Sequence, residues 1–122
     1  MNKICTSLEQ SKILAEILPI ESADLFWYRD AVTTEVNPRI INYMQIPKLQ
    51  SMYYFPCWSL AALLNILPNN QGRYTKSLYW FDDAWHCEYV DADGAGILDT
   101  SADNSIDACV KMILKLKKLN LL

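Results

Sequence analysis

The sequence predicts an α+β fold in which a small antiparallel sheet packs in two layers against about three helices. Three observations predict it. Apolar residues recur at helical spacing near both ends of the chain, a nearly all-apolar run occupies the middle, and alternating strand-like runs follow it. The chain has 122 residues, 52% of them hydrophobic and 20% charged, which is the composition of one folded domain spanning residues 1–122.

The first helix is predicted from the segment TSLEQSKILAEIL. Thr6 would cap this helix, and Glu9, three residues on, would reach back to the cap, which is the spacing of a capping box. Pro19 ends the run. The apolar positions that recur near helical spacing are Leu8, Ile13 or Leu14, and Ile17.

The next segments change from extended to helical character. ADLFWYRD (23–30) has the apolar and aromatic composition of a strand, and NPRIINYMQIP (37–47) is predicted to be extended because Pro38 and Pro47 punctuate it. PCWSLAALLNILP (56–68) is predicted to be a buried helix, since proline stands at both ends and the body is almost wholly apolar.

A meander of strands is predicted after this helix. YTKSLYWF (74–81) and AWHCEYV (84–90) read as two strands joined at Asp82–Asp83, and GILDT (96–100) reads as a third, short strand. Alternation along the second strand places two sets of side chains on opposite faces. One set is Trp85, Cys87 and Tyr89, and the other is Ala84, His86, Glu88 and Val90.

The last helix is predicted to begin near Asn104, a good N-cap, with Asp107 in its first turn. One face of this helix is predicted to be apolar and buried, and the opposite face to be basic and solvated. Basic residues late in the helix suit the negative end of the helix dipole. The apolar stripe is Ile106, Cys109 or Val110, Ile113, Leu116 and Leu119, and the basic stripe is Lys111, Lys115 and Lys118.

The stretch DADGAGILDTSAD (91–103) has the look of a calcium-binding loop. An EF-hand loop needs oxygen ligands at its first, third and fifth positions and a bidentate Glu at its twelfth. Counted from Asp91, the fifth position is Ala95 and the twelfth is Ala102. The segment before it also alternates as a strand, so we predict a strand–turn–strand connection whose turn chemistry comes from Asp93 and Gly94. No metal and no cofactor are expected.

The distribution of charged residues and of cysteines argues against several classes of protein. From Ser77 to Val110 the chain has no Lys or Arg but many carboxylates, and such an acidic region repels phosphate, so no nucleic-acid partner is expected. No long apolar run or signal-peptide stretch is visible, so we expect a cytoplasmic protein that does not enter membranes. In that setting the scattered cysteines are predicted to be buried free thiols: Cys5, Cys57, Cys87 and Cys109.

Two motifs carry a resemblance to a known family. FPCWSLAALLNILP fits the pattern P-x-WSL-x-x-LL-x-x-LP, and SADNSIDACVKMILKLKKLNLL begins with SADN-x-x-DA. With CTSLEQSKILAEI at the front, these segments resemble a family of uncharacterised small proteins encoded in phages and mobile elements of gut Bacteroides-type bacteria. The resemblance spans nearly the whole chain and implies a biological setting. It implies no catalytic residue.

One enzymatic arrangement competes with a purely binding role. Cys57 is predicted at the start of a helix, His86 on a strand and Asp99 at the end of the next, with Gln50 upstream. A papain-like cysteine hydrolase uses this order: thiol nucleophile, histidine base, orienting polar residue, and a glutamine that binds the oxyanion. Against it, the papain signature is reduced to Cys57–Trp58, and a cysteine in an apolar helix is most often core.

The sequence therefore favours a non-enzymatic phage or mobile-element accessory protein whose biological role is unknown. It is expected to act by binding a protein partner or by pairing with itself as a homodimer, because a small sheet leaves edges and aromatic side chains to be covered. The candidate interface residues are Tyr79, Phe81, Trp85 and Tyr89.

Overall fold

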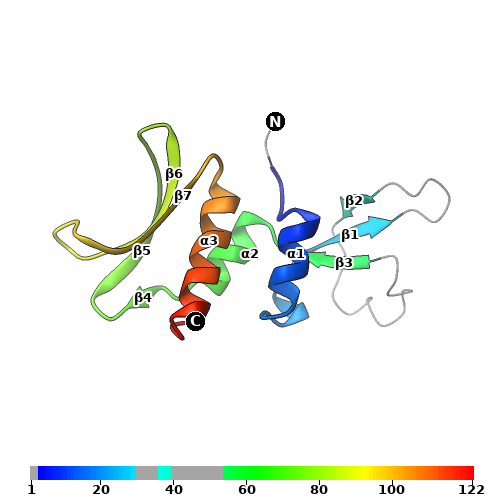
Figure 1. Ribbon diagram of the computed structural model, residues 1–122, viewed down its shortest axis with the longest axis horizontal. Helices are drawn as coiled ribbons and strands as arrows, with labels where there is room; N and C mark the ends of the chain where they lie inside the picture. The colour runs from blue at the N-terminus through cyan, green and yellow to red at the C-terminus, as the bar shows by residue number, and fades with distance from the viewer. Residues whose placement is uncertain (1–2, 30–35, 40–53) are drawn as a thin grey trace. The chain divides into compact units, whose positions relative to one another are not determined.

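The structure is a computed structural model (Figure 1) that describes residues 3–29, 36–39 and 54–122. Within these residues the fold is α+β, as predicted, with three α-helices and seven strands. The strands form two antiparallel sheets where the sequence predicts one. The chain divides into two compact units, residues 1–62 and 63–122, and each unit contains one of the sheets. No helix in the described ranges is long and apolar enough to cross a bilayer.

The first unit combines one helix with a three-stranded sheet. Helix α1 spans Leu8–Ala15 and is followed by a short 3-10 turn, η1, at Ile20–Ser22. Strand β1 (Leu25–Arg29) is central and pairs antiparallel with β2 (Val36–Arg39) and β3 (Tyr54–Cys57). The strand predicted at 23–30 is confirmed over Leu25–Arg29, and residue 30 lies outside the described residues.

Helix α1 is capped one residue later than the sequence predicts. Ser7 is the N-cap: its Oγ accepts a hydrogen bond from Gln10 N at 3.1 Å, and Gln10 Oε1 accepts one from Ser7 N at 2.9 Å. The predicted capping pair of Thr6 and Glu9 is wrong because Thr6 is buried and used elsewhere. Its Oγ1 accepts a hydrogen bond from the backbone N–H of Trp58 at 3.1 Å.

The middle helix is shorter than predicted. Helix α2 spans Leu60–Ile66, whereas the sequence predicts a helix over 56–68. Pro56 lies in β3, because proline favours extended backbone before it and is tolerated in an edge strand. Ser59 stands just before α2, and its Oγ accepts a hydrogen bond from Ala62 N at 3.2 Å. A serine cap therefore starts this helix.

The second unit contains a four-stranded sheet and the last helix. Its strand order is β4-β5-β6-β7, and all neighbours are antiparallel. Helix α3 lies against β6 and β7 on one face of this sheet (Figure 1). The elements are β4 (Asn70–Gln71), β5 (Tyr74–Phe81), β6 (Ala84–Val90), β7 (Gly96–Ala102) and α3 (Ser105–Lys118).

The face of the sheet that α3 covers is the one that alternation predicts to be buried. Cys87 and Tyr89 of β6 and Leu98 of β7 are all buried. The apolar stripe of α3 is buried too, at Ile106, Cys109, Val110, Ile113 and Leu116. The predicted stripe runs one residue too far, because Leu119 is 49% exposed and lies beyond the last helical residue, Lys118.

The end of α2 is tied to the sheet of the second unit by hydrogen bonds. Lys76 Nζ donates to the backbone carbonyls of Leu64 and Leu67, and Tyr89 Oη donates to the carbonyl of Pro68 at 2.6 Å. The last carbonyls of a helix have no partner within the helix, and a cation suits the negative end of its dipole. These bonds therefore satisfy the end of α2 and place Tyr89 in the core.

Candidate functional site

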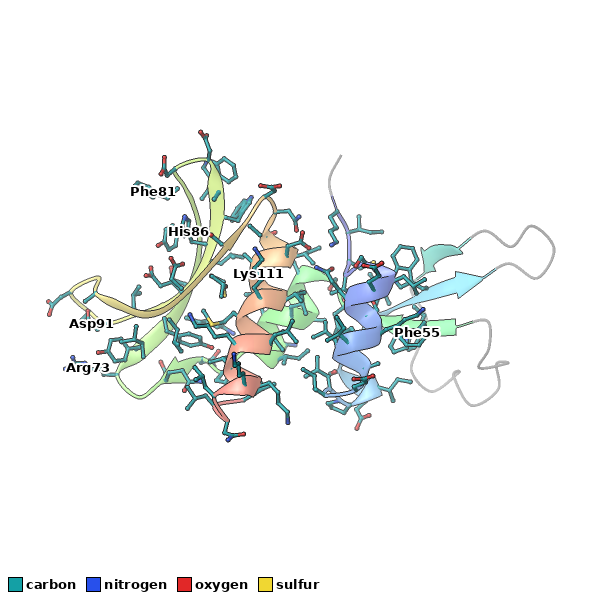
Figure 2. All side chains as sticks on the ribbon, in the orientation of Figure 1. Phe55, Arg73, Phe81, His86, Asp91 and Lys111 are labelled. Atoms are coloured by element: carbon teal, nitrogen blue, oxygen red, sulfur yellow. The ribbon has the colours of Figure 1, made fainter. Side chains whose placement is uncertain are left out.

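The outer face, as we call the face of the second sheet opposite α3, presents the side chains that alternate with the buried ones. Figure 2 shows Phe81 and His86 on the side of the sheet away from α3. The strand register places directly opposed residues on the same face. The outer face is therefore made of Ser77, Tyr79 and Phe81 from β5, Ala84, His86 and Glu88 from β6, and Ile97, Asp99 and Ser101 from β7.

Four polar side chains on the outer face form two hydrogen-bonded pairs, which ring stacking joins into one network. The rings of Tyr79 and His86 stack with centroids 5.2 Å apart and 12° between their planes. Tyr79 Oη donates to Glu88 Oε1 at 2.7 Å, and His86 Nδ1 lies 3.2 Å from Asp99 Oδ1. The hydrogen bond to Glu88 raises the pKa of Tyr79 to about 12, so the hydroxyl remains a donor at neutral pH.

The second ring nitrogen of His86 is also engaged. Nε2 lies 3.2 Å from the backbone carbonyl oxygen of Phe81, and the rings of the two residues are tilted at 57° with centroids 6.4 Å apart. Both neighbours of the imidazole, this carbonyl and the carboxylate of Asp99, are acceptors, and a protonated ring donates to both. A general base needs a ring nitrogen that can reach a substrate proton. His86 is instead placed to hold the β5–β6 hairpin together.

Cys57 lacks the surroundings of a nucleophile. It lies at the end of β3 and not at a helix N-terminus, since α2 begins only at Leu60. Cys57 is fully buried in an apolar cluster with Cys5 and Leu25, and burial raises the pKa of its thiol. A protonated thiol in an apolar core reacts slowly.

Two residues of the proposed hydrolase arrangement are in contact within one unit. His86 and Asp99 pair on the outer face of the second unit. Cys57 belongs to the first unit, and Gln50 lies outside the described residues. The burial of Cys57 and the engagement of both ring nitrogens of His86 do not favour the papain-like arrangement, which stays a hypothesis.

The candidate interface residues lie on both faces of the sheet. Tyr79 and Phe81 are on the outer face, where Phe81 is 66% exposed. Trp85 lies on the opposite face and meets Trp80 edge to face, with centroids 6.0 Å apart. Tyr89 is fully buried, so its place in the candidate interface is corrected: it is a core residue. The sequence had already placed Tyr89 beside a buried cysteine by alternation.

Ile97 is an exposed residue of the outer face that the sequence analysis missed. It is 51% exposed, although it is large and apolar. The signal that could have found it is the alternation of β7, in which Leu98 is buried and its neighbours Ile97 and Asp99 are exposed.

The loop after β6 is a turn, as predicted. Asp91 Oδ1 accepts hydrogen bonds from the backbone N–H groups of Asp93 at 3.0 Å and Ala95 at 2.9 Å, and Gly94 takes a left-handed φ of 85°. The side chain that organises the turn is therefore Asp91 and not the predicted Asp93. Among the residues that the structure describes, no three His, Cys, Asp or Glu side chains are grouped to hold a metal.

Lysines from α3 reach the free edge of the sheet. β7 is an edge strand, and Lys111 Nζ donates to the carbonyl of Ser101 at 2.8 Å. Lys115 Nζ makes a longer contact, 3.5 Å, to the carbonyl of Asp99. The region from Ser77 to Val110 contains no Lys or Arg, so these lysines come from α3, beyond that acidic region. Lysine is a residue that natural sheets use to block pairing at an edge.

Neither a model of a protein family, nor a curated protein, nor a solved structure matches this chain. What the chain does is therefore argued from the site itself. The site consists of an exposed aromatic and apolar face, a hydrogen-bonded network on it, and a sheet edge that lysines cover.

Proposed function

We propose that the chain is a non-enzymatic protein-binding domain, an accessory protein in the phage or mobile-element setting suggested by its motifs, and that its outer face binds a second copy of the chain. The observation that carries the proposal is the exposure of two large apolar side chains on this one face, Phe81 at 66% and Ile97 at 51%. They lie at the two ends of the face, with Tyr79 and His86 between them, and exposed apolar and aromatic groups on one face are typical of interaction sites.

Two carboxylates of the outer face already have hydrogen-bond partners within the chain. Glu88 accepts the hydrogen bond from Tyr79, and Asp99 is paired with His86. Carboxylates that already have partners lose less when water is removed from around them. The network therefore lowers the cost of burying this face against another protein surface.

The outer face is better suited to association than the edges of the same sheet. At one edge, β7 has carbonyls that Lys111 and Lys115 already occupy. At the other edge, β4 is only two residues long, Asn70–Gln71. Short edge strands and lysine-covered edges both oppose the addition of another strand.

A two-fold pair fits the distribution of charge on the face. Two-fold symmetry uses the same patch of both copies, so one exposed apolar surface is sufficient. If the two β5–β6 hairpins point in opposite directions, the acidic Asp82–Asp83 turn of one copy lies away from that of the other. The like charges are then separated and screened by salt.

The test removes the exposed apolar side chains and compares masses in solution. The double variant Phe81→Ser/Ile97→Ser should sediment as a monomer at micromolar concentrations where the unchanged chain sediments with twice the mass of one chain. The matched control is Ile13→Ser, since Ile13 is 50% exposed but lies on α1 in the first unit. It should dimerise like the unchanged chain.

Two results would overturn the proposal in different ways. A monomeric mass for the unchanged chain at every accessible concentration would exclude self-pairing, and the face would then require a different partner with an apolar centre and a basic rim. Equal dimerisation of the double variant and the unchanged chain, with far-ultraviolet circular dichroism confirming that both are folded, would place the interface elsewhere.

A further inference from the structure

The four cysteines, which are far apart in the sequence, meet in two pairs. The side chains of Cys5 and Cys57 are hydrogen-bonded to each other in the first unit, and those of Cys87 and Cys109 are hydrogen-bonded in the second. All four are free thiols and all four are buried, as the sequence predicts. The sequence contains no CxxC motif that would indicate these pairs, so they become apparent only in the fold.

Backbone hydrogen bonds beside the first pair fix its position. Thr6 N donates to the carbonyl of Trp58 at 2.9 Å, and Trp58 N donates to Thr6 Oγ1 at 3.1 Å. Thr6 directly follows Cys5, and Trp58 directly follows Cys57. The two chain segments are therefore held side by side where the thiols meet, and Cys5 and Cys57 also share one apolar cluster.

The hydroxyl group of Thr100 fixes the position of the second pair, Cys87 and Cys109. Thr100 lies opposite Cys87 in the β6–β7 register. Its Oγ1 is 2.8 Å from the carbonyl oxygen of Ala108, the residue before Cys109, and 3.4 Å from the carbonyl oxygen of Cys87. Thr100 thus links the strand that carries one cysteine to the helix that carries the other.

The pKa values of the two thiols of the second pair are shifted in opposite directions. The hydrogen bond between them lowers the pKa of Cys87 and raises the pKa of Cys109. Two interacting thiols typically titrate in this way, because the thiol that keeps its proton stabilises the thiolate beside it.

We propose that each pair closes into a disulfide, Cys5–Cys57 in the first unit and Cys87–Cys109 in the second, when the chain meets a disulfide oxidant such as oxidised glutathione. One cysteine thiolate attacks a glutathione sulfur and releases one reduced glutathione. The second cysteine then loses its proton and attacks the mixed disulfide, which releases the second. Two protein thiols become one disulfide, and the oxidant becomes two thiols.

The first pair has a route for the oxidant. Cys5 lines a cavity of about 310 Å³ together with Trp27 and Lys3. A disulfide oxidant can approach Cys5 through this cavity and be attacked there by the cysteine thiolate. The second pair must react during folding or through a local opening. Of the three ways in which four cysteines can be joined in two bonds, only the proposed one keeps both bonds within a unit.

The test is a linkage map of the unchanged protein. The chain is refolded, and separately incubated in its native state, in a mixture of reduced and oxidised glutathione, then alkylated, digested and analysed by mass spectrometry. We expect the two proposed linkages, with a mass lower by two hydrogens for each bond. The melting temperature should rise by roughly 10 °C and return to its starting value in dithiothreitol.

Two matched variants separate the pairs. Cys57→Ala should lose only the first linkage and Cys109→Ala only the second, each leaving its former partner open to alkylation. Linkages between the two pairs, or four alkylatable thiols in the refolded chain under conditions that oxidise a reference dithiol protein, would overturn the proposal. If a variant fails to fold, the map of the unchanged chain still decides the question.

Discussion

Asp82 and Asp83 show at the residue scale how the hairpin of the outer face is made. Both residues have left-handed backbone, with φ of 53° and 59°, and they connect β5 to β6 as a two-residue turn. A turn with two positive φ values is type I′, which favours Asn or Asp followed by Gly. Aspartate tolerates this backbone better than most residues, but less well than glycine.

Replacing Asp83 with glycine should therefore stabilise the protein. Asp83→Gly removes an unfavourable φ and one of two adjacent negative charges, and we expect the free energy of unfolding to rise by about 0.5–1 kcal/mol in urea titrations. The matched control is Asp103→Gly, because Asp103 is also an exposed aspartate but does not have a positive φ. An equal gain in the control would show that charge alone, and not the turn, was responsible.

Helix α3 shows at the element scale how local signals define a boundary. Asn104 Oδ1 accepts a hydrogen bond from Asp107 N at 2.8 Å, and Asn104 Nδ2 donates to Asp107 Oδ2 at 2.8 Å. Lysines follow in the last turn, at the negative end of the helix dipole. The helix is thus capped at its start and matched in charge at its end.

Loss of this cap should destabilise the protein. Asn104→Ala removes both hydrogen bonds to Asp107, and we expect the free energy of unfolding to fall by about 1 kcal/mol. Asn104→Ser keeps an oxygen acceptor and should retain most of the stability. The cap would be energetically unimportant if the alanine and serine variants unfolded at the same urea concentration as the unchanged chain.

The features of the fold that the sequence predicts correctly are those that depend on residues close to one another in the sequence. The cap of α3, its buried stripe and the three-strand meander depend on residues a few positions apart, and they are confirmed. The cap of α1 and the start of α2 were missed because Thr6 bonds to Trp58 and the segment before α2 pairs with β1. Such long-range contacts leave no local pattern in a sequence.

The same holds for the candidate site: its short-range features could be predicted from the sequence, and its long-range contacts could not. Alternation and a two-residue turn place Tyr79 opposite His86, and the sequence contains all the information for that pairing. The same register places Trp85 and Tyr89 on the opposite face of the sheet. The set of candidate interface residues did not take this alternation into account. The contacts of Lys111 and Lys115 with β7 depend on how a helix packs across a strand, and no spacing rule gives them.

At the scale of the whole molecule, the chain has two compact units, and their boundary falls between Ala62 and Leu63, inside α2. The prediction that residues 1–122 behave as one domain remains a prediction. It was made from length and composition, and the shared helix is consistent with it, because neither unit contains a complete α2. Each unit also contains two tryptophans: Trp27 and Trp58 in the first, Trp80 and Trp85 in the second.

These tryptophans allow the unfolding of the two units to be followed separately. In the variant Trp80→Phe/Trp85→Phe, fluorescence reports only on the first unit, while circular dichroism reports on both. We expect the two urea transitions to coincide, since one cooperative domain unfolds in a single step. Different midpoints for the two signals would divide the chain into two independently folding domains.

The lysines that lie against β7 protect it only while α3 is folded. If the last helix frays before the sheet opens, the carbonyls of Asp99 and Ser101 lose their donors, and the longer free edge of the sheet becomes a template for strands of other molecules. Whether the protein aggregates on unfolding therefore depends on whether α3 unfolds before the sheet. A chain cut short before α3 would keep the residues of all four strands but lose both the lysines at the edge and the apolar stripe that covers one face, and we expect it to aggregate.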